Sequence, residues 1–152
     1  MRPNDYDAHL GLALAIRGPI TGAEANYDQL VAAAQAELDA AKKIDPNRPD
    51  AYYNEGILTQ EFKAKAGGPK EKTIASLKEA KSIFQTFLEK ASGKPEYDGV
   101  VKRVKGDGSK KDLGRLGDID DTIAFLELDA NAQKDAVNQS SADAASEGEK
   151  KE

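Results

Sequence analysis

The feature that most constrains this chain is an internal repeat whose unit has the length of a helical hairpin. Gly11 aligns with Gly56, and the residues beside them align too, at an offset of about 45 positions. A second set of small and apolar positions aligns at nearly the same offset: Ala34, Leu38 and Ala41 with Ala80, Phe84 and Phe87. A repeat period of roughly 20 to 50 residues is typical of proteins built by stacking one small unit on the next.

Start and stop signals divide the first unit into two helices. Gly18-Pro19 ends a helix over about 5–17, because proline has no N–H for the next helical turn. A second helix runs from there to about residue 44. Two capping patterns fit its start, and the sequence leaves both open: Thr21 with Glu24, and Asn26 with Gln29.

The second unit repeats this layout. A proline-rich break over 45–49 precedes a third helix over about 50–66, which Gly67-Gly68 ends. A fourth helix is expected over about 70–91, with an apolar stripe wide enough to bury one face. The stripe consists of Ile74, Leu77, Ala80, Phe84, Phe87 and Leu88.

Beyond the two units the pattern weakens. A short helix over 97–104 is followed by a loop over 105–117 and by a last helix that starts at about Asp118. The apolar side chains of this last helix are expected to cap the surface formed by Phe84 and Phe87: Ile119, Ile123, Leu126 and Leu128. Residues 1–130 are therefore expected to form one domain. Residues 131–152 have few large apolar side chains and are expected to be a disordered acidic tail.

The stretch Asp-Ala-Tyr-Tyr-Asn-Glu-Gly at 50–56 resembles the first-helix signature of the tetratricopeptide repeat family, and Asp45-Pro46-Asn47 resembles the turn that ends its repeats. The resemblance covers two repeats, about 5–46 and 49–92. It implies an all-α fold, a right-handed solenoid of helical hairpins in which 95–130 is a degenerate third repeat and cap. In that family the matching positions have packing roles: Gly11 and Gly56 allow close helix approach, Ala34 and Ala80 fill the facing slot, and Pro46 ends the second helix.

The chain also departs from the family pattern. Its period exceeds the roughly 34 residues of the family, and the additional length falls at 18–26 and 62–73, between the two helices of each hairpin. Glu55 stands where an aliphatic residue is usual. The segment 2–6 resembles the repeat boundary at 45–52, which suggests that the chain begins within an array of repeats.

Two further stretches, 48–58 and 118–123, are similar to the tetratricopeptide lipoproteins of the bacterial adventurous-gliding machinery. That similarity implies a periplasmic or cell-envelope scaffold. The chain has no cysteine to carry a lipid anchor, and without this similarity a cytoplasmic location is equally compatible with the sequence.

Composition argues against several classes of function. A net charge of −5 disfavours nucleic acid and anionic membrane surfaces as partners. The longest apolar run, 10–16, is far shorter than the roughly 20 residues that span a bilayer, so direct membrane insertion is not expected. With one histidine and no cysteine, the chain lacks the usual nucleophile and metal sets. We therefore expect no enzyme activity, no cofactor and no metal.

Two charged clusters have a functional and a structural interpretation. Asp112, Asp118, Asp120 and Asp121 could ligate calcium or magnesium, but their spacing does not form an EF-hand, and acidic residues also favour the first turn of a helix. The basic stretch over 102–115 could contact phosphates, but it lacks a P-loop ending and stacking aromatics. For both clusters, the structural interpretation is preferred: a helix start and a solvated loop.

The tetratricopeptide resemblance implies that first-helix side chains bind a partner peptide in a concave groove. By register these residues are His9, Leu12, Ile16, Tyr53, Asn54, Ile57 and Gln60. The alternative is that Leu12 and Ile57 only pack between neighbouring helices. The expected function is a protein–protein interaction scaffold or adaptor, and the alternative is a module that self-associates into a homo-oligomer.

Overall fold

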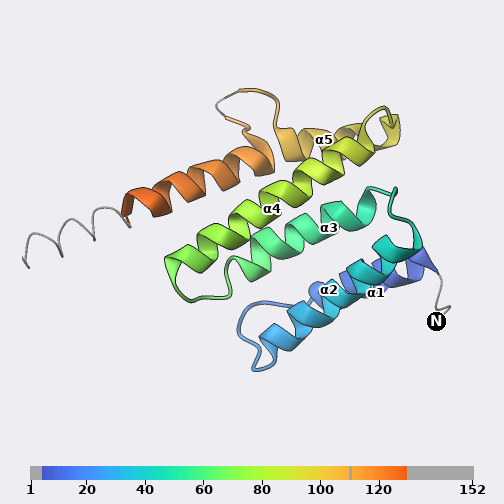
Figure 1. The fold of residues 1–152 in the computed structure, drawn as a ribbon, viewed down its shortest axis with the longest axis horizontal. Helices are drawn as coiled ribbons and strands as arrows, with labels where there is room; N and C mark the ends of the chain where they lie inside the picture. The colour runs from blue at the N-terminus through green and yellow to red at the C-terminus, as the bar shows by residue number, and fades with distance from the viewer. Residues whose placement is uncertain (1–4, 110, 130–152) are drawn as a thin grey trace, which may run out of the picture.

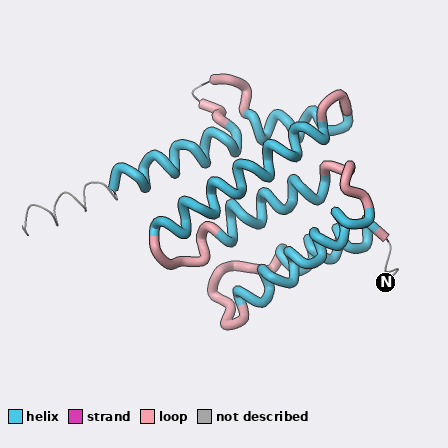
Figure 2. Tube along the Cα trace, in the orientation of Figure 1, coloured by secondary structure: helices cyan, strands magenta, loops and turns pink. Residues whose placement is uncertain are grey.

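The computed structural model describes residues 5–109 and 111–129, and all the regular elements in these ranges are helical (Figures 1 and 2). The helices of the first unit are α1, Tyr6–Arg17, and α2, Tyr27–Ile44. The second unit comprises α3, Asp50–Leu58, a π-helical turn η1, Thr59–Lys63, and α4, Lys70–Ala91. A 3₁₀ turn η2, Pro95–Tyr97, leads into α5, Asp98–Lys105, and residues 114–129 form a last helical segment.

Successive helices pack on one another in chain order. The helix α1 contacts α2, and α3 lies between α2 and α4 (Figure 1). The shorter α5 and the 114–129 segment both pack against α4. The expectation of an all-helical fold is therefore confirmed, with α3 as the helix that joins the two hairpins.

The predicted boundaries of the first, second and fourth helices agree with α1, α2 and α4. The structure agrees with the later of the two predicted starts, because α2 begins after Asn26, although the Asn26 side chain makes no capping hydrogen bond. The other pattern closes the preceding loop instead: the N–H and the hydroxyl of Thr21 each donate to Glu24 Oε1 at 2.7 Å. These hydrogen bonds lower the pKa of Glu24 to about 2.

The third helix differs from its predicted course. The α-helix ends at Leu58 and widens into the π-helical turn η1, which a sequence periodicity of 3.6 does not anticipate. The hydroxyl of Tyr27, at the start of α2, donates to the Phe62 carbonyl in this turn at 2.8 Å. The turn also places Gln60 and Glu61 toward the C-terminal part of the chain, where both accept from Arg115 and Glu61 lines the pocket described below.

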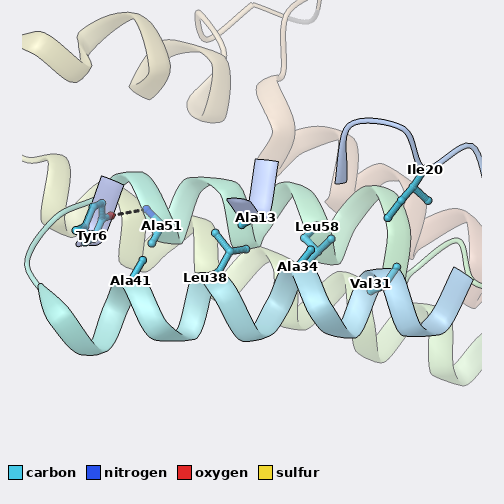
Figure 3. Packing of buried hydrophobic residues seen from close by; sticks show 9 residues of the cluster. All are labelled: Tyr6, Ala13, Ile20, Val31, Ala34, Leu38, Ala41, Ala51 and Leu58. Carbon is cyan, nitrogen blue, oxygen red and sulfur yellow. Dashed lines mark hydrogen bonds between the residues drawn. The ribbon is translucent and has the colours of Figure 1, made fainter. Parts of the chain in front are cut away.

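The first hydrophobic cluster joins α1, α2 and both ends of α3 (Figure 3). Ala34, Leu38 and Ala41 of α2 are at most 1 % exposed. The buried Tyr6 accepts a hydrogen bond of 2.9 Å from the Ala51 N–H, which lies in the first turn of α3 and has no acceptor inside that helix. Burial raises the pKa of Tyr6 to about 12.

The second cluster surrounds Phe84 and Phe87 of α4, which are fully buried. Tyr53 packs on both rings, with a centroid distance of 5.3 Å to Phe87. The last helical segment covers this cluster as predicted through Ile119 and Ile123. It begins at 114 rather than at Asp118.

One residue of the predicted cap is corrected. Leu128 is 71 % exposed, because a helical periodicity that turns Ile119 and Ile123 inward turns Leu128 outward. Phe125 is 69 % exposed on the same segment. Ion pairs tie the segment to α4 along its length: Lys81 with Asp120, Lys78 with Glu127, and Lys70 with Asp129.

The two aligned glycines have different environments. Gly56 is buried on α3, and a Cβ placed there would lie 2.6 Å from the Phe84 ring, so its predicted role in close packing is confirmed. Gly11 is exposed, and a Cβ there would meet no atom within 4 Å. Its predicted packing role is wrong, because α1 packs on its neighbours through Tyr6 and Ala13 and turns Gly11 away from them.

Gly56→Leu is expected to lower the free energy of unfolding by about 1–3 kcal/mol, because the new side chain collides with Phe84. Gly11→Leu is the matched control and is expected to raise it by roughly 0.5–1 kcal/mol through helix propensity alone. Urea unfolding measures both. Equal effects at the two positions would contradict the packing assigned to Gly56.

Candidate functional site

The residues predicted to line a groove do not form one open surface. His9 lies between α1 and α2, where its Nδ1 is 2.6 Å from Glu37 Oε2 and its side chain is 12 % exposed. Leu12 and Ile16 are half-buried, and Ile16 packs against the first cluster. The structure therefore separates His9 from the face that the repeat register assigns to it.

The four residues of the predicted groove that lie on α3 and η1 are closer together, and most of them have partners within the chain. Ile57 packs against the second cluster. Asn54 donates to the Asp50 carbonyl at 2.9 Å, and its own carbonyl accepts from the Arg17 guanidinium at 3.2 Å. Gln60 is buried and accepts from Arg115 at 2.7 Å. Tyr53 is the one of these four that lines an open pocket.

This pocket has a volume of about 660 Å³ and lies between α3, η1, α5 and the start of the 114–129 segment. We call it the basic pocket. It is lined by Tyr53, Glu61, Gly99, Lys102, Arg103, Lys111, Asp112, Leu113, Gly114, Arg115 and Asp118. Four of these residues carry a positive charge and three a negative charge, so cations predominate on its walls.

Three of the four cations form no direct ion pair in the part of the chain that the structure describes, although Lys102 lies close enough to Asp107 to lower the pKa of that carboxyl. Lys102, Arg103 and Lys111 are exposed and form no ion pair there. Lys102 and Arg103 lie in the last turn of α5, where positive side chains also interact favourably with the helix dipole. The fourth cation, Arg115, is held by η1 at its Nη1 atom, 2.7 Å from Gln60 Oε1 and 3.1 Å from Glu61 Oε1.

A glycine contact shapes the wall that carries Lys111. A Cβ at Gly106 would lie 2.2 Å from the Asp112 carbonyl oxygen, and a Cβ at Gly114 would lie 2.2 Å from the Gly106 nitrogen. Both glycines have positive φ angles, of 75° and 63°. Only glycine fits this backbone contact without strain, and it closes the loop 106–114 at its base.

Side-chain hydrogen bonds order the inside of the same loop. The Ser109 N–H donates to Asp107 Oδ1 at 2.8 Å, and the Lys111 N–H donates to Ser109 Oγ at 3.2 Å. The hydrogen bonds from Ser109 hold the pKa of Asp107 below its usual value. The loop that was predicted to be only a solvated connection is therefore one wall of the basic pocket.

Arg17 of α1 lies near the pocket without lining it. Burial lowers the pKa of its guanidinium, the Tyr53 hydroxyl group raises it, and the positive charge of Arg115 lowers it further. Arg17 is therefore within electrostatic reach of two residues that line the pocket, Tyr53 and Arg115.

The acidic cluster has structural roles in the described ranges. Asp112 Oδ1 accepts from the Gly114 N–H at 3.3 Å, and Asp120 pairs with Lys81 at 2.6 Å. No group of three or more histidine or carboxylate side chains arranged to hold a metal ion occurs within residues 5–109 and 111–129. None of the described helices is both long and apolar enough to cross a bilayer.

Comparison of the chain with protein-family models, with curated proteins and with solved structures gives no match. Its site is therefore described from its own residues. The sequence singled out Tyr53 and, separately, the basic stretch over 102–115. It contained no local signal that the two meet, because Tyr53 and Lys102 are brought together only by the packing of α3, α4 and α5.

Arg115→Met is expected to lower the free energy of unfolding by about 1–3 kcal/mol, because the buried Gln60 oxygen loses its donor. Arg103→Met removes an exposed, unpaired cation from the same pocket and is expected to change stability by less than about 0.5 kcal/mol. Urea unfolding at neutral pH compares the two variants. An equal loss in both would contradict the positioning role of Arg115.

The same substitution, Arg115→Met, is also expected to change the pKa of Glu61. Partial burial raises the pKa of this carboxyl, but the hydrogen bonds from Lys65 and Arg115 outweigh it and leave the pKa below its usual value. Glu61 therefore stabilises the fold above the pKa of 4.5 expected when unfolded, and this contribution is lost as the pH falls through the folded value. In Arg115→Met the pKa of Glu61, followed by NMR titration, is expected to rise.

Proposed function

We propose that this chain is a protein–protein interaction scaffold or adaptor that binds a segment of a partner polypeptide in the basic pocket. The observation that carries the proposal is the pocket itself, about 660 Å³ in volume and bordered by helices of both the repeat region and the C-terminal part. It offers an aromatic side chain, Tyr53, and an exposed aliphatic one, Leu113, among charged groups. Such a mixture suits an extended peptide, whose backbone and side chains need both kinds of contact.

The architecture that we propose for this scaffold is a tetratricopeptide-like array, in which α1 with α2 and α3 with α4 are successive repeats. Gly56, Ala34 and Ala80 support it, because all three are buried at helix contacts. Pro46 supports it through its place just after the end of α2. The similarity of 48–58 and 118–123 to gliding lipoproteins adds the hypothesis that the scaffold works in a bacterial cell-envelope complex.

A steric block tests the proposal without removing any internal contact. Gly99 lines the pocket from α5, and a Cβ there would meet no atom within 4 Å, so Gly99→Phe fills the pocket while the fold stays intact. Peptides are first selected from a displayed random library on the wild-type chain. Gly99→Phe is expected to weaken their binding by about tenfold or more, as measured by fluorescence anisotropy.

Gly11→Phe is the matched control, because Gly11 is also an exposed helical glycine with open space around it but lies outside the pocket. It is expected to leave the affinity of the selected peptides unchanged. Backbone amide shifts on peptide addition should concentrate at 53, 99–103 and 111–115. Peptides that bind both variants as well as the wild type would show that the pocket is not the binding site.

A second candidate function is self-association. Phe125 and Leu128 favour it, since both are about 70 % exposed and lie three residues apart on one helical segment, where they share a face. Light scattering separates the candidates. A molar mass that rises with concentration, and that Phe125→Ser with Leu128→Ser returns to that of a monomer, would favour an assembly module over a monomeric adaptor.

A further inference from the structure

The charge of the basic pocket defines the chemistry of its ligand more narrowly than its shape does. Lys102 and Arg103 enter from α5 and Lys111 from the opposite loop, so cations from two separate elements face one cavity. None of the three forms a direct ion pair with a carboxylate within residues 5–109 and 111–129, although Lys102 acts electrostatically on the carboxyl of Asp107. Like charges gathered in one concave site repel each other, and a bound anion relieves that repulsion.

The loop and the arginine of the pocket are held by contacts within the chain. The contact between Gly106 and Gly114 closes the loop that carries Lys111, and Ser109 fixes the loop interior through the Lys111 N–H. On the other side, Gln60 and Glu61 hold Arg115 in place. A charged site that is ordered in this way before binding loses less conformational entropy when a ligand arrives.

The carboxylates of the pocket determine which class of anion fits. Glu61, Asp112 and Asp118 lie among the cations on its walls. A nucleic acid presents a phosphate at every nucleotide, so some of its phosphates would lie against these carboxylates, whereas a polypeptide can place neutral residues there. Tyr53 is the one aromatic side chain among the residues that line the pocket, whereas successive bases of a strand need successive stacking surfaces.

We infer that the ligand of the basic pocket is an acidic segment of a partner protein, whose aspartate or glutamate side chains pair with Lys102, Arg103 and Lys111. This inference rests on the proposed function and names the partner chemistry of the same site. The carboxylates on the walls add specificity, since they accept only a segment whose negative charges lie opposite the cations. Uncharged and basic segments leave the three cations unpaired.

Fluorescein-labelled hexaglutamate is the probe, and anisotropy measures its binding to the full chain at low and at physiological salt. Substituting Lys102→Gln, Arg103→Gln and Lys111→Gln together is expected to weaken binding by about tenfold or more. The control combines Lys43→Gln, Lys72→Gln and Lys78→Gln, which lie outside the pocket, are exposed and change the net charge equally. Its expected effect is less than about twofold, because distant exposed charges are screened over roughly 10 Å.

Other probes identify the source of the negative charge. Hexaglutamine, which lacks the charges, is expected not to bind. A phosphoserine peptide of equal length that binds more tightly than hexaglutamate, and depends on the same three cations, would overturn the carboxylate assignment in favour of phosphate. An oligothymidylate that does the same would replace the polypeptide ligand with a nucleic acid. If the pocket and control variants lose equal affinity for hexaglutamate, the effect is due to overall charge, and the proposed binding site is wrong.

The Gly99→Phe variant keeps this inference separate from the proposed function. If the selected peptides no longer bind Gly99→Phe but still bind when the three cations are substituted, the acidic ligand is wrong and the scaffold proposal stands. If no peptide binding responds to Gly99→Phe, both fail. The scaffold proposal and the acidic-ligand inference are both supported if hexaglutamate no longer binds Gly99→Phe or the pocket variant but still binds Gly11→Phe and the control variant.

Discussion

Two neighbouring residues of α3 join the hairpins, and the rest of the structure depends on the different contacts they make. Glu55 turns to α2, where its carboxylate accepts from Gln35 Nε2 and from Lys42 Nζ, each at 2.7 Å. Gly56 faces α4, and because it has no side chain the Phe84 ring packs directly against its backbone. A short helix of nine residues is thereby fixed on both sides, by a charged network on one and by close packing on the other.

The charged side of this junction is buried, which makes its partners interdependent. Glu55 is 8 % exposed, and an unpaired carboxylate at that depth would be strongly unfavourable. Burial by itself lowers the pKa of Lys42, but the hydrogen bonds and charges of Glu55 and Asp39 outweigh it and hold the pKa above its usual value. Lys42 therefore stays charged at neutral pH, and the pair sets the distance between α2 and α3.

Local signals in the sequence were sufficient for the helices and insufficient for the site. Prolines, glycines and capping residues gave the ends of α1, α2 and α4, because those signals act within a few residues. The repeat alignment identified Gly56 correctly and Gly11 incorrectly, since the outward turn of Gly11 depends on how α1 packs. The partner of His9 is Glu37, on another helix, and no local pattern relates the two. The basic pocket likewise depends on α5 and Arg115 coming to rest beside α3.

The glycine contact at the base of loop 106–114 has a consequence for how such a chain can diverge. Gly106 and Gly114 meet backbone to backbone at the base of the loop. This contact fixes how α5 leads into the following helical segment, whatever residues lie between the two glycines. Substitutions or insertions between the two glycines alter the surface presented to a ligand without altering the helices on either side. Part of the recognition surface is thus separable from the residues that hold the fold, whereas Arg115 and Tyr53 belong to both. Descendants of this chain could therefore change the loop at less risk to the fold than those two residues.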